Sequence, residues 1–267
     1  MQLNILNLEK KEIGKAKLPA QFDEEVRSDL IQRAVLAIEN GKRQSYGAFK
    51  EAGQRPSAKL SRRRRNFKGT YGKGISRIPR KTMTRRGSSF FWVGALMPGT
   101  VGGRGAHPPK SEKIVIQKIN KKENKKAIRS SLSATMNPKI VSARGHIIPK
   151  EYPFIITNDF EELRKTKEVS LALEKLGFSE EMERNGKVRI RAGKGKSRGR
   201  RYVRNRGILI VVSKECNLRK AAGSLPVEVK IINEINAGDL APGAVPGRAT
   251  LFTQKAIEII EKEKMFE

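Results

Sequence analysis

The sequence predicts an α/β protein: a three-layer α/β/α domain with a short, mainly parallel sheet, plus a long extended internal loop. Three observations carry this prediction. Short apolar runs typical of buried strands alternate with amphipathic stretches of helical periodicity. The positive charge is concentrated in two blocks without acidic residues. The longer block is rich in glycine and proline and lacks helical periodicity, so we interpret it as an extension leaving the folded domain.

In the N-terminal half, strands are expected at residues 3–8 and 13–18 and helices at residues 28–40 and 121–136. Leu30, Ile31 and Val35 fall on one face of the first helix, and Gly41 is placed to end it. Pro138 is expected to end the second helix, because proline cannot continue one.

The second half continues the alternation. Strands are expected at residues 153–157, 207–213 and 227–232, and helices at residues 158–176, 217–223 and 254–264, with a helical turn near Glu180. Asn158 and Glu161 have the spacing of a capping pair that would open the helix ending at Gly177. In the last helix, Ala256, Ile257 and Ile260 form the face expected to be buried.

The charge is unevenly distributed along the 267 residues, whose net charge is +30. Residues 52–111 hold fifteen Lys or Arg and no acid, and residues 187–206 hold ten and no acid. The other 187 residues carry only +5. We therefore expect a globular domain formed by residues 1–50 and 112–267, a basic extended loop at 51–111, and a second basic segment at 187–206 within the domain.

A polyanion is the simplest partner for these blocks. A stretch of sixty residues at +15 repels itself unless a dense anion neutralises it, and nucleic acids provide one. A membrane surface would favour an amphipathic helix, which the glycines and prolines of residues 52–111 exclude. A solvated polar face or a floppy tail remains the alternative interpretation.

Residues typical of enzymes do not form a recognisable catalytic set. Gly195-Lys196-Ser197 ends like a phosphate-binding loop, but the first glycine of that motif would fall on Ile190. Cys216 is the single cysteine and has no histidine near it, while His107 and His146 are interpreted as phosphate contacts or packed rings. We expect a non-enzymatic intracellular protein without a cofactor or metal of its own; bound magnesium would belong to the RNA.

The two blocks supply the candidate RNA-binding residues. In the first they are Arg55, Lys59, Arg62, Arg63, Arg64, Arg65, Lys68, Lys73, Arg77, Arg80, Lys81, Arg85, Arg86, Arg104, His107 and Lys110. In the second they are Arg191, Lys194, Lys196, Arg198, Arg200, Arg201, Arg204 and Arg206. Candidate rings for stacking on unpaired bases are Phe67, Tyr71, Phe90, Phe91 and Trp92. For residues 90–93, a local apolar plug packed on the protein itself is an equally open interpretation.

Several motifs occur in an order that covers nearly the whole chain. They are Arg77-Ile78-Pro79-Arg80, Gly105-Ala106-His107-Pro108-Pro109-Lys110, Arg191-Ala192-Gly193-Lys194-Gly195-Lys196 with Arg198-Gly199-Arg200-Arg201, and Leu240-Ala241-Pro242-Gly243 leading to Gly247-Arg248. With these motifs the chain resembles the family of universal large-subunit ribosomal protein four, in its archaeal and eukaryotic branch.

The resemblance implies a structural protein of the large ribosomal subunit that supports early assembly and has no catalytic activity. It implies large-subunit ribosomal RNA and neighbouring ribosomal proteins as partners, and a cytoplasmic location in the ribosome. The long loop would reach the nascent-chain exit tunnel beside the other protein of the tunnel constriction, with Tyr71, Lys73, Arg77, Ile78 and Arg80 nearest to the tunnel. We expect neither membrane association nor a homo-oligomer.

Two other classes remain as alternatives. An RNA-modifying or RNA-processing enzyme on an α/β scaffold would need a cofactor, a metal, or a cluster of acids or histidines in one pocket. A DNA-compacting chromatin protein is the third possibility, which competition between loop-containing RNA and duplex DNA would distinguish.

Overall fold

The computed structural model describes residues 1–266 of the chain. The chain divides into two compact units, which we call the body (Met1–Lys42 with Ile116–Glu267) and the basic segment (Arg43–Val115). The basic segment begins and ends several residues outside the loop expected at 51–111. Eighteen Lys or Arg and two acids, Glu51 and Glu112, lie in it.

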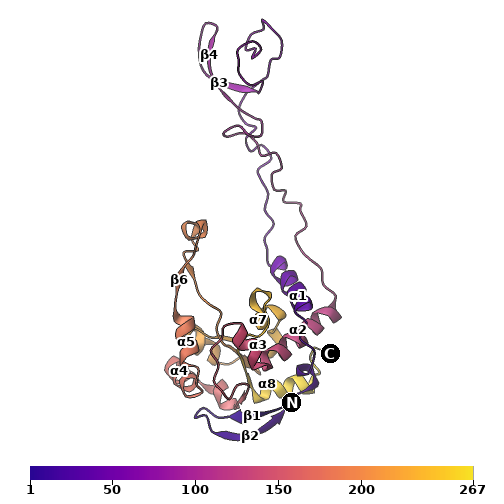
Figure 1. Ribbon diagram of the computed structural model, residues 1–267, viewed down its shortest axis with the longest axis vertical. Coiled ribbons are helices and arrows are strands. Elements are labelled where there is room, and N and C mark those ends of the chain that lie inside the picture. Colours follow the sequence, from indigo (N-terminus) through magenta and orange to yellow (C-terminus); the bar gives the residue numbers. More distant parts are fainter. Residues whose placement is uncertain (267) are drawn as a thin grey trace. The chain divides into compact units, whose positions relative to one another are not determined.

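A six-stranded sheet forms the centre of the body, in the order β2-β1-β5-β10-β8-β9 (Figure 1). The strands are β1 (Gln2–Leu6), β2 (Glu12–Lys17), β5 (Ile155–Ile156), β8 (Leu209–Val212), β9 (Glu228–Ile231) and β10 (Thr250–Thr253). β1 and β2 pair antiparallel, and every other neighbouring pair is parallel. The expected mainly parallel sheet is confirmed.

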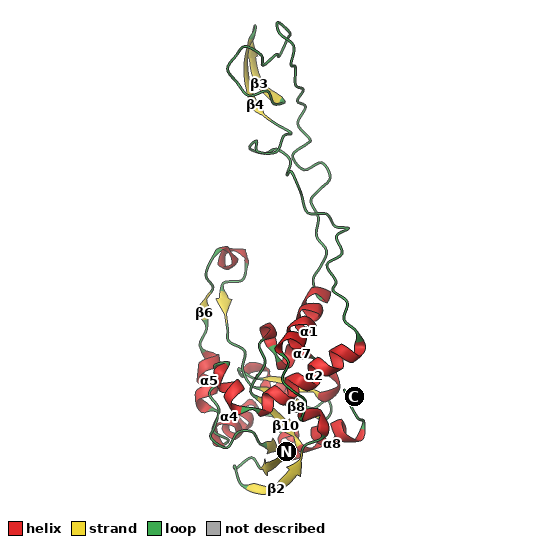
Figure 2. Cartoon of the chain, turned by 45° about the vertical axis from the view of Figure 1, so that its right-hand side comes forward, coloured by secondary structure: helices red, strands yellow, loops and turns green. Residues whose placement is uncertain are grey.

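Helices cover both faces of the sheet (Figure 2). One core joins the sheet to α1 (Ser28–Gly41), α2 (Lys121–Met136), α7 (Ala237–Leu240) and α8 (Gln254–Lys262). The other joins it to α3 (Pro138–Ala143), α4 (Thr166–Lys175), α5 (Ser179–Gly186) and α6 (Leu218–Ala221). Short 3-10 turns lie at Ala20–Phe22, Asn158–Glu162, Lys194–Arg198, Ala222–Ser224, Ile232–Glu234 and Pro242–Ala244.

Strand β8 shows why the three layers form. Leu209 and Val211 lie in one core, whereas Ile210 and Val212 lie in the other. Successive side chains of a strand point to opposite faces, so a continuous apolar run needs helices on both sides. The expected three-layer α/β/α architecture is confirmed.

Two local expectations for the body were wrong. Residues 158–176 do not form one helix, because the 3-10 turn Asn158–Glu162 ends before α4 begins at Thr166. Asn158 and Glu161 are not a capping pair: the Asn158 side chain accepts from the Lys255 N–H, and Glu161 binds Ser213 and Thr253.

Pro138 ends α2 and also begins α3, where the Asn137 side chain caps the new helix by accepting from the Lys139 N–H. Strand β10 was not expected either, since Thr250–Thr253 is only four residues long and runs directly into α8. It nevertheless lies between β5 and β8, at the centre of the sheet.

The basic segment contains a hairpin that the sequence did not predict. Strands β3 (Arg80–Arg86) and β4 (Ser89–Gly94) pair antiparallel, and Gly87 at φ 56° opens the two-residue turn. The pairing places Thr82 opposite Trp92 and Arg85 opposite Phe90. Arginine and lysine in β3 hide the strand pattern, because they stand where a half-buried strand would carry apolar residues.

The two ends of the basic segment run side by side. The Ala48 N–H donates to the Pro109 carbonyl at 2.9 Å. At Gly53, with φ 74°, a Cβ would collide with the backbone of Gly103 and Arg104, so only glycine allows the two chains to approach this closely. Among residues 1–266, no helix has the length and apolar character needed to cross a membrane.

Candidate RNA interface

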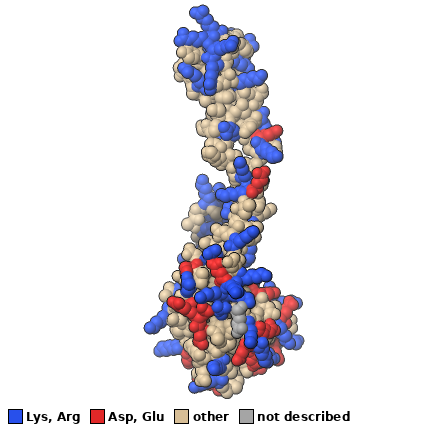
Figure 3. Space-filling view, turned by 90° about the vertical axis from the view of Figure 1, so that its right-hand side faces the viewer, with Lys and Arg blue, Asp and Glu red and all other residues tan. Residues whose placement is uncertain are grey.

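Among the described residues, the candidate cations of the basic segment lack acidic partners, with the exception of Arg55. Every candidate cation is exposed except Arg80, Lys81, Arg104 and Arg191, which are half-buried. Within residues 1–266, only Arg55 (with Glu51) and Arg206 (with Glu228) form ion pairs among these candidates. Figure 3 shows the contrast: blue side chains with few red ones cover the visible face of the basic segment, whereas both colours mix on the body.

Aromatic rings organise several of these cations. The guanidinium groups of Arg64 and Arg77 lie 4.6 and 4.7 Å from the centroid of the Tyr71 ring, and Arg64 also donates to its hydroxyl. Such contacts hold the guanidinium groups in place while leaving their N–H donors available. Arg64, Tyr71 and Arg77 therefore present two charges at a defined spacing.

The five candidate stacking rings do not lie in equivalent places. Phe90 stacks on Trp92 at 5.2 Å between centroids, and Phe67 packs edge-on against Phe90 at 5.3 Å. Lys73 lies over both Phe90 and Trp92. These three rings form the local apolar plug, in which Phe90 and Trp92 are half-buried and Phe67 stays 57% exposed.

Phe91 differs from the other four rings. It points to the opposite face of the hairpin, is 77% exposed, and has no ring or cation contact among the described residues. Of the candidate rings, Phe91 is therefore the one best placed to stack on an unpaired base.

A cavity of about 480 Å³ opens in the basic segment. Lys59, Arg62, Arg63 and Lys68 line it together with Phe67. None of these four cations has an acidic partner within residues 1–266. The cavity is thus suited to a segment of phosphodiester backbone.

The second basic block forms a hairpin in the body. Strands β6 (Arg189–Ile190) and β7 (Tyr202–Val203) pair antiparallel, and the Arg191 N–H donates to the Arg201 carbonyl at 2.7 Å. The 3-10 turn at its tip carries exposed Lys194, Lys196 and Arg198. We call residues 187–206 the basic hairpin; Figure 1 shows it projecting beyond α5.

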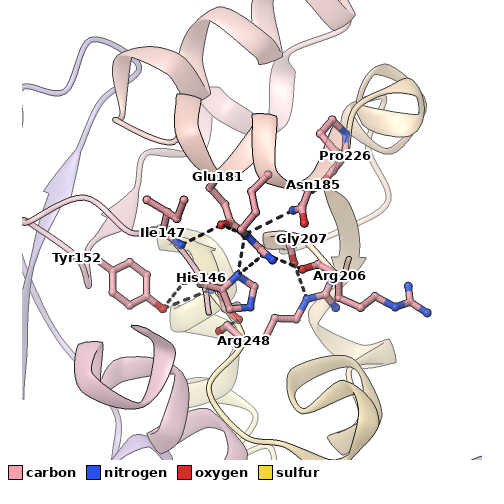
Figure 4. A network of polar contacts seen from close by, with 11 residues as sticks. His146, Ile147, Tyr152, Glu181, Asn185, Arg206, Gly207, Pro226 and Arg248 are labelled. Atoms are coloured by element: carbon pink, nitrogen blue, oxygen red, sulfur yellow. Dashed lines mark hydrogen bonds and ion pairs between the residues drawn. The ribbon is translucent and has the colours of Figure 1, made fainter. Parts of the chain in front are cut away.

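Buried arginine holds the root of the basic hairpin. Arg248 is 1% exposed, and its Nε donates to the Gly207 carbonyl at 2.8 Å (Figure 4). Its Nη2 donates to Glu228, also at 2.8 Å. Glu228 also pairs with Arg206 at 3.5 Å. At Gly207 a Cβ would collide with Asn185 and Pro226, so no larger residue fits.

A second set of contacts fixes the same root from α5. Glu181 is fully buried and accepts from both Nε and Nη2 of Arg184, at 2.7 and 2.6 Å. It also accepts from the Ile147 N–H at 3.0 Å and lies 2.7 Å from His146 Nδ1. Arg184 in turn donates to the Arg206 carbonyl at 3.1 Å.

The charge state of Glu181 follows from these contacts. Burial alone would raise the pKa of its carboxyl, but hydrogen bonds from Arg184, His146 and the Ile147 N–H outweigh burial and lower the pKa to about 2. Since Arg184 cannot accept a hydrogen bond, we assign the His146 Nδ1 proton to the contact with Glu181. We call Glu181, Arg184, Arg248 and Glu228 the root clamp.

The two histidines therefore have different surroundings. His146 is a packed ring, 6% exposed and bonded to Glu181. His107 is exposed in the basic segment, where a phosphate contact remains open to it. Residues 1–266 contain no group of three or more His, Cys, Asp or Glu side chains arranged to hold a metal ion.

Comparison with known proteins identifies the family of this chain. The model of the ribosomal protein L4/L1 family matches residues 16–263. The chain belongs to this family. It is 45% identical to the large ribosomal subunit protein uL4 of Nanoarchaeum equitans, with each chain covered over its full length. It is 42% identical to uL4 of Methanocaldococcus jannaschii and 38% identical to uL4 of Archaeoglobus fulgidus, covering 97% or more of each chain. The family resemblance drawn from the motifs is confirmed.

The structure also gives a role to one of the motifs that carried the resemblance. Gly247-Arg248, which sequence reasoning used only for recognition, supplies the arginine of the root clamp. Sequence reasoning missed Arg184, Glu181 and Glu228 as well, because nothing in an isolated Arg or Glu indicates burial. The only available signal was Arg248, a cation in an otherwise apolar and glycine-rich C-terminal stretch.

Proposed function

We propose that this protein is a structural constituent of the large ribosomal subunit. It binds large-subunit ribosomal RNA through the basic segment and the basic hairpin, supports early subunit assembly, and is not an enzyme. The observation that carries the proposal is the set of exposed cations without acidic partners in a chain of the L4/L1 family. Neither the RNA-modifying enzyme nor the chromatin protein has a comparable observation in its favour.

The two basic regions would bind RNA in different ways. The basic hairpin is held at its root by the buried Glu181 and Arg248, so little conformational entropy is lost when Lys194, Lys196 and Arg198 meet phosphates. In the basic segment, the β3–β4 hairpin, the Phe67–Phe90–Trp92 cluster and the pairing of the two ends are formed by the protein itself, and the rest is loop and turn. We expect RNA to order its remaining loops, and phosphates to supply the missing counter-charges.

The finer assignments come from the family resemblance. Residues Tyr71, Lys73, Arg77, Ile78 and Arg80 would lie closest to the exit tunnel, beside the other protein of the constriction. The hairpin would contact RNA close to the body. The protein would act in the cytoplasm as part of the ribosome, with no cofactor of its own and with magnesium ions held by the RNA.

Co-sedimentation tests this function directly. The purified protein is incubated with large-subunit ribosomal RNA, and the complex is washed at increasing salt. We expect the wild type to remain bound at moderate salt and a variant with Arg198, Arg200 and Arg201 changed to Ala to dissociate at lower salt.

A matched variant removes the same charge from the body, with Arg164, Lys167 and Lys175 changed to Ala; these residues are exposed and make no direct ion-pair contact among the described residues, although Lys175 acts on Glu9 at longer range. It should behave like the wild type. Equal loss in both variants would mean that net charge alone, and no defined interface, holds the RNA.

A further inference from the structure

A cavity of about 380 Å³ opens on the body beside the root of the basic hairpin. Arg206 and Arg248, both labelled in Figure 4, belong to its wall. The other walls include the C-terminal end of α1, with Ile38 and Lys42, and helix α7, with Asn236 and Asp239. The cavity thus combines an apolar side chain with three cations and three carboxylates, those of Glu39, Glu228 and Asp239. Arg248 and Glu228 also belong to the root clamp, whereas the α1 and α7 residues of the wall have no role described above.

Asp239 is the unusual group in this cavity. Its side chain forms no hydrogen bond within residues 1–266, its charge acts on the Arg248 guanidinium without direct contact, and its Oδ2 is enclosed. Rotation about the Cβ–Cγ bond exchanges the two oxygens, so one oxygen faces the cavity while the other stays enclosed. A group that donates to the facing oxygen of this charged carboxylate would be bound favourably.

Asn236 provides a neighbouring donor. Its Oδ1 accepts from the Asp239 N–H at 3.1 Å, which fixes the orientation of the amide. Its Nδ2 has no partner among the described residues and remains able to donate. One turn of α7 therefore offers a donor, Asn236 Nδ2, next to an acceptor, the Asp239 carboxylate.

The Watson–Crick edge of guanine complements this pair. It presents the O6 acceptor followed by the N1–H and N2–H donors, so O6 would face Asn236 and the two donors would face Asp239. Adenine would place its N1 lone pair near the carboxylate, and uracil and cytosine each offer the carboxylate only one donor position. Pairs of this kind discriminate between bases by about 1–3 kcal/mol.

We propose that this cavity binds an unpaired guanine of the RNA held by the basic hairpin. The base would lie against Ile38, and Lys42 and Arg206 would reach its phosphate. The inference rests on the proposed RNA-binding function and adds base-specific recognition to it. Since Arg206 belongs both to the basic hairpin and to the cavity wall, an RNA strand gripped by the hairpin passes this cavity.

Guanine footprinting tests the proposal. The full-length protein is bound to a large-subunit ribosomal RNA transcript, and the complex is treated with kethoxal, which modifies guanine at N1 and N2. We expect one unpaired guanine to be protected by the wild type and to regain about fivefold or more of its reactivity with Asp239→Asn. Asp159→Asn, at an exposed aspartate elsewhere on the body, is the matched control and should protect like the wild type.

The sign of the charge change makes the test specific. Asp239→Asn raises the net charge of an already cationic protein by one, so electrostatic attraction to RNA does not fall. Loss of a single protection therefore reports lost base recognition. If the variant does not fold, inosine at the protected position tests the same contact from the RNA side. Inosine lacks the N2 amino group and is not modified by kethoxal, so the measurement is the affinity of the wild-type protein, which should fall for the inosine-containing RNA.

Two results would overturn the proposal. One is a wild-type footprint in which no guanine loses its protection with Asp239→Asn, and in which inosine at no protected position weakens binding. The other is Asp239-dependent binding of free guanosine monophosphate without any protected guanine in the RNA. Failure of the RNA-binding function itself would look different, because no protein variant would then leave a footprint at any position.

Discussion

Single buried charges of the body determine how the basic hairpin is held. Arg248 and Glu181 are almost inaccessible to solvent, yet their partners include the hairpin root: the Gly207 carbonyl directly and the Arg206 carbonyl through Arg184. Buried ion pairs stabilise a fold only modestly, but loss of one partner leaves an uncompensated charge. We therefore interpret the root clamp as a device that orients the hairpin.

Glu181→Gln tests the root clamp at the residue scale. We expect it to lower the free energy of unfolding at pH 7 by about 3 kcal/mol, because Arg184 loses its counter-ion. The folded-state pKa is lowered to about 2, so the contribution of Glu181 is complete above the unfolded-state pKa near 4.5 and is lost as the pH falls toward 2. Urea unfolding at pH 7, 4.5 and 3 measures both effects.

Glu180→Gln is the control, since Glu180 is an exposed neighbour on α5. The pH dependence of the wild type should be steeper than that of Glu181→Gln between pH 4.5 and 3, and should match that of the control. Parallel curves for the wild type and Glu181→Gln would show that the carboxyl is not held in its charged form.

Substitution of Phe91 separates the two interpretations of residues 90–93, which are stacking on RNA bases and an apolar plug packed on the protein itself. Phe91→Ala should lower RNA affinity by about 1–3 kcal/mol without changing the hairpin, because its ring is exposed. Phe90→Ala should instead disturb the plug that it forms with Phe67 and Trp92, which Trp92 fluorescence would report in the free protein. Unchanged RNA affinity of Phe91→Ala would remove base stacking from the account.

At the scale of elements, apolar periodicity predicted the helices whose apolar face packs into the core. Helix α2 has the expected bounds, and Ala256, Ile257 and Ile260 are buried in α8 as expected. β10 and the β3–β4 hairpin were missed, because a four-residue strand and a strand full of arginine carry too little local signal. The strands that pair with β10 are distant from it in sequence, and in β3 the charged residues mask the strand pattern. Only the tertiary contacts therefore reveal these strands.

Strand β8 offers a test of the expected core. Ile210→Asp should unfold the body, since it buries an unpaired charge at a position with no solvent exposure. Ile13→Asp on β2, where Ile13 is 65% exposed, is the matched control and should remain folded. Circular dichroism of both variants is sufficient; a native spectrum and an unchanged midpoint for Ile210→Asp would contradict the assignment of β8 to the core.

For the molecule as a whole, the division of charge could be predicted from sequence, while the clamp and the guanine cavity could not. Counting Lys, Arg, Asp and Glu along the chain located the cationic regions, because charge density is a property of the sequence itself. Burial of Arg248 and the juxtaposition of Arg206 with Asp239 depend on loops that meet only in the folded body. Which of the predicted RNA-binding residues touch phosphate stays a prediction.

The salt dependence of RNA binding measures that prediction most directly. With large-subunit ribosomal RNA, changing Arg62, Arg63, Arg64 and Arg65 to Ala should reduce the slope of log affinity against log salt by about three, since each neutralised phosphate contributes about 0.7–0.9. The unfolding midpoint of the body should stay that of the wild type. A variant with Arg164, Lys167, Lys175 and Lys220 changed to Ala should keep the wild-type slope. An unchanged slope after loss of the four arginines would contradict the account, because it would mean that these unpaired cations do not neutralise RNA.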